Sequence, residues 1–207
     1  YAHYAVQQIP NFEVHAGATV NLTAPVEYND LVLVSNGTSS GQLFGADDFL
    51  SLTGNAYFEF VVNATARLWY AFAVPWQVDA ATGVSVNGHT LQLGKDFDII
   101  YYDGARRAAV GPQRTWNYVA NGEALQPGKL YMIVLMSDAS AIRFAKQADT
   151  PYFTNSTSVS TYASGTGSDT DANWNGIANP ALFHAFVNAG ATLGQVYQPA
   201  SETYTPI

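Results

Sequence analysis

The chain has 207 residues, a net charge of −8 and no cysteine, and 48% of its residues are hydrophobic but only 12% are charged. This length fits one large β domain or two small ones. The eight Lys and Arg residues are scattered, so a nucleic-acid partner is excluded. The lack of cysteine excludes disulfides and thiolate sites. The sequence has no apolar run of about 18 residues, so we expect no transmembrane helix.

Such a charge-poor surface must be solvated by Ser, Thr, Asn, Gln and Tyr. This composition is typical of secreted and cell-surface β proteins. We therefore expect an extracellular or cell-surface location.

Short β-prone runs separated by Gly or Asn turns recur about every ten residues in the first part of the chain, residues 1–64. They lie at 12–14, 19–22, 31–34, 41–44 and 49–52. Brief strands at this spacing are typical of solenoid rungs that stack on one another. A meander within one sandwich sheet would give the same pattern, so both alternatives stay open.

Longer strands and hairpin turns follow in residues 65–207, which we interpret as an antiparallel β-sandwich. Asn87-Gly88 suits a type I′ hairpin turn, and Asp103-Gly104 is also expected to form a turn. Trp69, Tyr70 and Phe72 stand in an apolar run and are predicted to lie in the core. The expected fold is thus all-β, in two parts or in one continuous domain. The main predicted strands are 56–62, 69–74, 97–102 and 130–135.

The last quarter of the chain is the least regular. Residues 154–173 are almost all small or polar and predict a long loop with one short strand at 159–162. Pro180–Val187 could begin a helix, but Val and two Phe favour a strand.

The sequence contains one candidate metal site. Asp169, Asp171, Asn173 and Asn175 place oxygen side chains at alternate positions before Gly176, as calcium-binding loops do. The match is partial, because Leu182 stands where an EF-hand loop has its bidentate Glu. The alternative is that these side chains satisfy backbone donors in a polar turn. No other cofactor is expected.

Four sequons offer glycan acceptors in a secretory product: Asn21, Asn36, Asn63 and Asn155. A chain so rich in Asn, Ser and Thr acquires some sequons by chance.

No catalytic constellation is evident. Asp96 and Asp98 flank the start of a predicted strand and would share a face, which is more typical of a solvated edge than of a glycosidase pair. The four histidines have no metal-binding spacing, and no nucleophile elbow or phosphate loop occurs. Arg106-Arg107 is expected to lie at a solvated hairpin tip. We therefore expect no enzymatic activity.

Aromatic residues give the better functional indication. Flat Trp and Tyr faces beside amide groups bind sugars on β-sandwiches, and this chain has four Trp and 13 Tyr. Trp116 stands in a polar segment and is the candidate ligand-binding residue.

Four segments together resemble a β-rich module of exported cell-surface proteins of Bacteroidetes, often found near repeats. The resemblance covers about residues 40–207 and depends most on Trp174-Asn-Gly-Ile-Ala-Asn-Pro180. It implies an extracellular, adhesin-like or scaffold module and assigns no catalytic residues. The other three segments are Trp69–Trp76, Gly94–Gly104 and Leu125–Ile133.

The expected function is therefore a structural or adhesive surface module that contacts proteins or glycans. One alternative is a subunit of an extracellular filament, in which residues 1–9 complete a neighbour's sheet by strand addition and the chain self-associates. Another is a carbohydrate-binding domain.

Overall fold

The computed structural model describes residues 10–110, 115–152, 195–198 and 203–206. Within these ranges the chain is built from strands and two short helices, so the all-β prediction is confirmed. The segments 1–9, 154–173 and 180–187, for which specific predictions were made above, lie outside the described residues.

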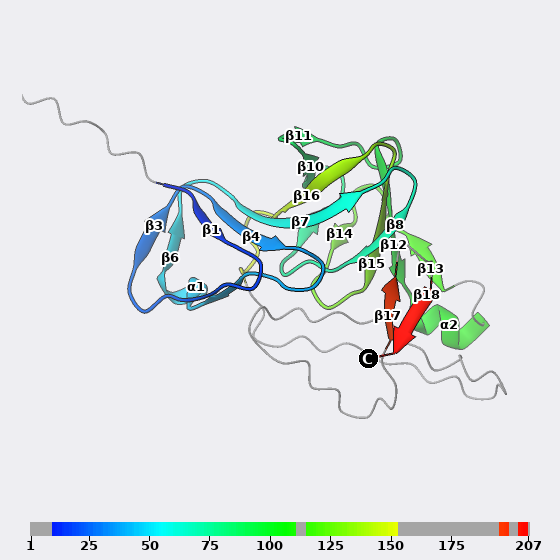
Figure 1. Cartoon of the computed structure of the whole chain (residues 1–207), viewed down its shortest axis with the longest axis horizontal. Coiled ribbons are helices and arrows are strands. Elements are labelled where there is room, and N and C mark those ends of the chain that lie inside the picture. The colour runs from blue at the N-terminus through cyan, green and yellow to red at the C-terminus, as the bar shows by residue number, and fades with distance from the viewer. Residues whose placement is uncertain (1–9, 111–114, 153–194, 199–202, 207) are drawn as a thin grey trace, which may run out of the picture.

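Six short strands in the first third of the chain pair in parallel (Figure 1). We call residues 12–28 the first coil and residues 31–52 the second coil, because each runs through three strands and the second lies in register with the first. A meander would have paired consecutive strands antiparallel, and these strands do not pair in that way. The first coil contains β1 (Phe12–Val14), β2 (Thr19–Asn21) and β3 (Val26–Tyr28), and the second β4 (Leu31–Ser35), β5 (Gln42–Phe44) and β6 (Leu50–Leu52).

The register of the coils is set by strand pairing and also at their corners, the turns that connect successive strands. Phe12 lies opposite Leu31 and Leu31 opposite Ala56, so equivalent inward positions stack in a column. Gly41 turns the second coil tightly against the first, since a Cβ there would lie 2.2 Å from the carbonyl oxygen of Val14. A larger residue does not fit at this position without moving the backbone.

Strand β7 (Ala56–Ala64) belongs to two arrangements at once. Its first half pairs in parallel with β4, and its other edge pairs antiparallel with β16 (Ala139–Ala145). The coils therefore continue into a six-stranded sheet of order β1-β4-β7-β16-β10-β11. Its last strands are β10 (Val84–Val86) and β11 (His89–Thr90), which Asn87 and Gly88 join with positive φ angles of 51° and 77°, as a type I′ turn requires.

A second, fully antiparallel sheet has the order β13-β12-β15-β8. The two larger sheets share one core, in which the rings of Phe72 and Phe144 stack at 4.8 Å. Of the three residues predicted to lie in this core, Phe72 is buried whereas Trp69 and Tyr70 are half-buried. The strands of this sheet are β8 (Trp69–Phe72), β12 (Phe97–Tyr102), β13 (Trp116–Tyr118) and β15 (Tyr131–Leu135).

Smaller elements complete the fold. The helix α1 (Ala46–Phe49) occupies part of the run predicted as strand 49–52, so the strand begins one residue later, at Leu50. The helix α2 (Gly104–Val110) replaces the turn expected at Asp103-Gly104. Two further strand pairs are β9 (Val78–Asp79) with β14 (Ala124–Leu125) and β17 (Gln195–Gln198) with β18 (Thr203–Pro206).

Candidate functional site

The candidate ligand residue, Trp116, lies on β13 at the edge of the four-stranded sheet. It is half-buried, and its ring meets that of Tyr102 edge to face at a centroid distance of 5.3 Å. Tyr118, two residues further along the same strand, is 68% exposed. We call these three residues the aromatic edge.

The strand register explains why these rings share a face. Tyr102 lies opposite Trp116, and Ile100 lies opposite Tyr118. Since alternate side chains of a strand point to opposite faces, the four residues lie on the side of the sheet away from the core. Ile99, which directly precedes Ile100 and so points to the opposite face, is fully buried in the core.

A polar network flanks the aromatic edge. Asp103 accepts hydrogen bonds from the backbone N–H of Arg106 (2.9 Å) and from the side-chain amide of Asn117 (2.8 Å). The guanidinium of Arg106 in turn donates to the side-chain oxygen of Asn117. Asp103 thus caps α2 and also fixes the orientation of an amide on β13.

Arg107 anchors α2 to the sheet, in contrast to the solvated tip predicted for the arginine pair. Arg107 is 9% exposed, and its guanidinium lies 3.4 Å from the hydroxyl of the buried Thr115. Arg106 remains exposed, as predicted. The sequence carried a signal for this helix, because Asp103 is a good N-cap and three alanines and two arginines follow it.

This arrangement suits binding more than bond cleavage. Exposed Tyr and half-buried Trp rings offer flat apolar faces, and the amide and guanidinium groups beside them can hydrogen-bond hydroxyls. Asp103 is the carboxylate of the network, and both of its oxygens accept hydrogen bonds from Arg106 and Asn117. The geometry of Asp103 therefore supports a positioning role.

The other two predicted carboxylates lie at the start of β12. Asp96 accepts a hydrogen bond from the backbone N–H of Gln92 at 2.9 Å and so closes the turn before β12. Asp98 lies within β12, opposite Val134. Asp98 lies on the same outward side of β12 as Ile100 and Tyr102, next to the aromatic edge, whereas Asp96 precedes the strand.

Three side chains in or beside α1 have shifted pKa values. Partial burial raises the pKa of the Asp47 carboxyl, although the backbone N–H of Tyr152 partly opposes this by bonding the carboxylate. Burial also raises the pKa of Tyr152 and lowers that of Lys146. The ammonium of Lys146 lies 4.7 Å from the centre of the Tyr152 ring. The bond from the backbone N–H of Tyr152 to the carboxylate of Asp47 joins the segment after β16 to α1.

Three of the four predicted glycan acceptors are described, and all three are exposed. Asn21 lies on β2, and Asn63 lies near the end of β7 with a positive φ of 47°. The side-chain oxygen of Asn36 accepts hydrogen bonds from the backbone N–H groups of Thr38 (3.1 Å) and Ser39 (2.9 Å). Asn155 lies outside the described residues, as do the proposed calcium ligands Asp169, Asp171, Asn173 and Asn175.

Within the described ranges, no group of three or more His, Asp or Glu side chains is arranged to hold a metal ion. No helix in the same ranges is long and apolar enough to cross a membrane. No protein family, curated protein or solved structure shows a significant match to this chain.

Proposed function

We propose that this chain is a non-catalytic, extracellular structural and adhesive module whose aromatic edge binds a glycan. The observation that carries the proposal is the exposure of Tyr118, at 68%, beside the paired rings of Trp116 and Tyr102. Aromatic rings that lie together at a surface offer a continuous apolar face for a ligand, and sugar rings present C–H groups that pack on such faces.

Electrostatics narrows the class of glycan. The chain carries a net charge of −8, which disfavours polyanionic ligands. The charge of Arg106 balances that of Asp103 across Asn117, so the polar network beside the rings has no net charge. A neutral oligosaccharide fits this edge better than a sulfated or uronic-acid polymer.

The architecture supports the structural part of the proposal. We infer that residues 12–64 form solenoid-like coils and that the two larger sheets form a sandwich behind them. Strand β7 takes part in both, so the coils and the sandwich are joined by continuous hydrogen bonding. Such a junction suits a module that transmits load or spaces a binding edge away from a surface.

Binding to a panel of neutral oligosaccharides tests the proposal. We expect Trp116→Ala and Tyr118→Ala each to weaken binding of any glycan found on the array by about tenfold, because each removes one stacking face. Tyr57→Ala is the matched control, since Tyr57 lies on the six-stranded sheet beneath Arg143. It should leave binding unchanged.

Two results would contradict the proposal. Glycan binding that survives both substitutions would place the ligand elsewhere, and the absence of binding across the panel would remove the adhesive role. Hydrolysis of a bound glycan would contradict the non-catalytic part alone.

A further inference from the structure

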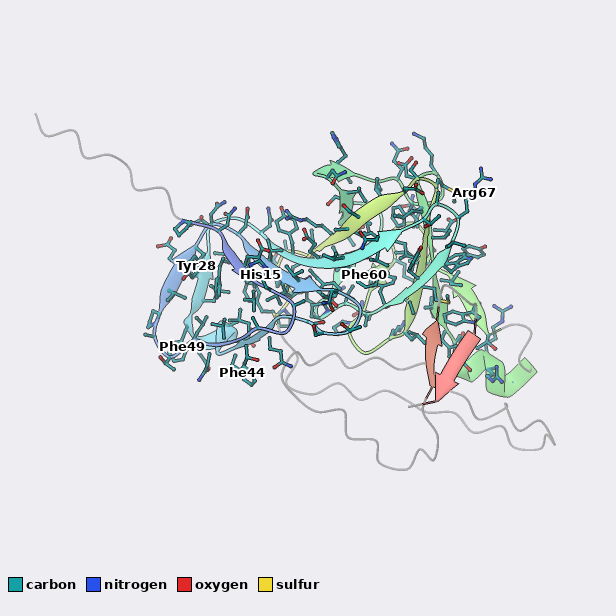
Figure 2. The ribbon with its side chains drawn as sticks, viewed as in Figure 1. His15, Tyr28, Phe44, Phe49, Phe60 and Arg67 are labelled. Carbon is teal, nitrogen blue, oxygen red and sulfur yellow. The ribbon has the colours of Figure 1, made fainter. Side chains whose placement is uncertain are left out.

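The first coil has an open end. Strands β1, β2 and β3 each pair with a strand of the second coil on one side, and no described strand lies on their other side. This end lies far from the four-stranded sheet in Figure 1, and His15 and Tyr28 mark it in Figure 2. We call the three strands together the open edge.

Main-chain groups along the open edge point away from the second coil. In a parallel pair, alternate residues of a strand direct both their N–H and C=O groups to the same neighbour. The N–H of Phe12 donates to the carbonyl of Asp30 at 2.7 Å, so Phe12 bonds toward β4. The next residue, Glu13, therefore directs its N–H and C=O groups away from the second coil.

The same pattern holds on the other two strands. The carbonyl of Ala18 and the N–H of Leu22 bond the second coil, which leaves Thr19 and Asn21 directed outward. The carbonyl of Tyr28 accepts the N–H of Thr53 at 3.0 Å, which leaves Glu27 directed outward. Unpaired strand edges of this kind are templates for another strand.

The corner of the coils already shows how a further layer fits. The carbonyl of Asn29 accepts the N–H of Gly54 at 2.7 Å, and the carbonyl of Pro10 accepts the N–H of Asn29 at 2.9 Å in the same manner. The side chains at this corner are bonded in the same order. The amide nitrogen of Asn29 donates to the side-chain oxygen of Asn11 at 3.0 Å, and the amide oxygen of Asn29 accepts from the hydroxyl of Thr53 at 3.4 Å. The corner ladder therefore reaches the open end at Asn11.

Burial differs between the coils at two of the stacked positions, although Val14 of the first coil is itself buried. Leu31 and Leu43 are fully buried, whereas Phe12 and Val20, which lie opposite them in the first coil, are only half-buried. The ring of Phe12 stacks on that of Tyr28 at 4.6 Å across the end of the column. A further layer would bury this apolar surface as the first coil buries that of the second.

We propose that the open edge docks one further coil of parallel β-structure, contributed by polypeptide outside these 207 residues and carrying cationic side chains opposite Glu13 and Glu27. Glu13 contacts His15 at 3.3 Å, and no ion pair of Glu27 is found among the described residues. Opposite charges directly across a strand pair stabilise it, and like charges destabilise it. A second copy docked through the same edge would bring these carboxylates together, so a foreign coil fits better.

Two synthetic peptides test this proposal. Both have the sequence of residues 10–30, and one carries Glu13→Lys and Glu27→Lys, so that its lysines fall opposite the two glutamates of the full chain. We expect the lysine peptide to bind about fivefold more tightly than the unsubstituted peptide at low salt, from two exposed pairs. The difference should shrink at high salt.

Two variants of the full chain locate the contact. Thr19→Pro removes an outward N–H and keeps the backbone bonds to β5, but it also removes the hydroxyl that donates to Gln42 on β5 at 3.1 Å. Thr19→Ala, which loses that side-chain bond alone, is the control, and we expect Thr19→Pro to bind at least tenfold more weakly than Thr19→Ala. Glu13→Lys combined with Glu27→Lys should reverse the preference between the two peptides.

Covalent linkage of the lysine peptide to the chain allows the contact to be measured even where the free peptide binds weakly. Joined to the N-terminus of the chain by a flexible Gly/Ser linker, the lysine peptide should slow amide exchange of Glu13, Thr19 and Glu27 by at least tenfold. Unchanged exchange in the tethered form, or binding that Thr19→Pro leaves intact, would overturn the proposal. A stable dimer of the unmodified chain that Thr19→Pro dissolves would assign the edge to a second copy and would also overturn it.

Discussion

At the residue scale, Tyr131 shows how a single polar atom in the core links stability to pH. The side chain is 2% exposed and packs on Phe72, with a ring-centroid distance of 5.6 Å. Its hydroxyl accepts the backbone N–H of Gln126 at 2.8 Å. Burial raises the pKa of Tyr131 to about 12, from an ordinary value of 10.0.

This raised pKa predicts a loss of stability in alkali. Between pH 10 and 12 the folded protein keeps the phenolic proton of Tyr131, whereas the unfolded chain releases it. The contribution of Tyr131 to the free energy of unfolding is therefore complete below pH 10 and is lost as the pH rises toward 12. A shift of this size corresponds to about 2–3 kcal/mol. Tyr131→Phe should cost about 1 kcal/mol at pH 8 through the lost hydrogen bond, and should flatten the alkaline decline.

Urea unfolding at intervals between pH 8 and 11 measures both effects. Tyr118→Phe is the control, because Tyr118 is 68% exposed and its substitution should change neither stability nor its pH dependence. Equal slopes for the unmodified chain and Tyr131→Phe would show that another group governs the decline.

Residue-level predictions from the sequence succeeded where a local pattern determines the environment. The turn at Asn87-Gly88 formed because Asn and Gly tolerate the positive φ angles that a type I′ turn needs. The prediction for Arg107 was wrong. Its burial depends on a contact with Thr115, which lies eight residues later in the sequence, after the end of α2. Trp116 was identified as a candidate, but its pairing with Tyr102 follows from a strand register that the sequence does not show.

At the scale of elements, the corner ladder of the coils is the feature that specifies register. The side-chain amide of Asn29 donates to Asn11 and to Asp30, and its oxygen accepts from Thr53. The carboxylate of Asp30 accepts a further hydrogen bond from the backbone N–H of Asn55, at 2.7 Å. These contacts link the residues that directly precede the first coil, the second coil and β7.

The ladder predicts a gradient of stability effects. Asn29→Ala removes contacts on both sides and should lower the free energy of unfolding by about 1 kcal/mol. Asn11→Ala removes a single contact at the open end and should cost only a few tenths of a kcal/mol. Chemical denaturation of both variants checks this order, and an equal or reversed effect would contradict it.

Strand positions were more predictable than strand partners. Apolar alternation located most strands of the first third, but the same short runs suit a meander or stacked coils, because pairing depends on contacts 19–25 residues apart. The helix α2 was missed for a related reason, since the preceding β-prone run and Asp103-Gly104 favoured a hairpin turn over an N-cap.

At the scale of the whole molecule, β7 joins the coils to the two larger sheets. A single hydrophobic cluster extends from Val14 and Leu33 in the coils to Phe144 and Ile99 in the sheets. Elements that share both a strand and a core cannot unfold without exposing each other's apolar surface. We therefore expect the coils and the sheets to unfold together.

The position of the tryptophans makes this expectation testable, because all four follow residue 64 and none lies in the coils. Leu33→Ala, at a position that is fully buried in the second coil, should destabilise the protein by about 2–5 kcal/mol. If unfolding is cooperative, the midpoint of the tryptophan fluorescence transition falls by the amount that this cost requires. Ser51→Ala, at an exposed position of the same coil, should leave that midpoint in place. A tryptophan transition unmoved by Leu33→Ala would mean that the coils unfold independently of the sheets, despite the strand they share.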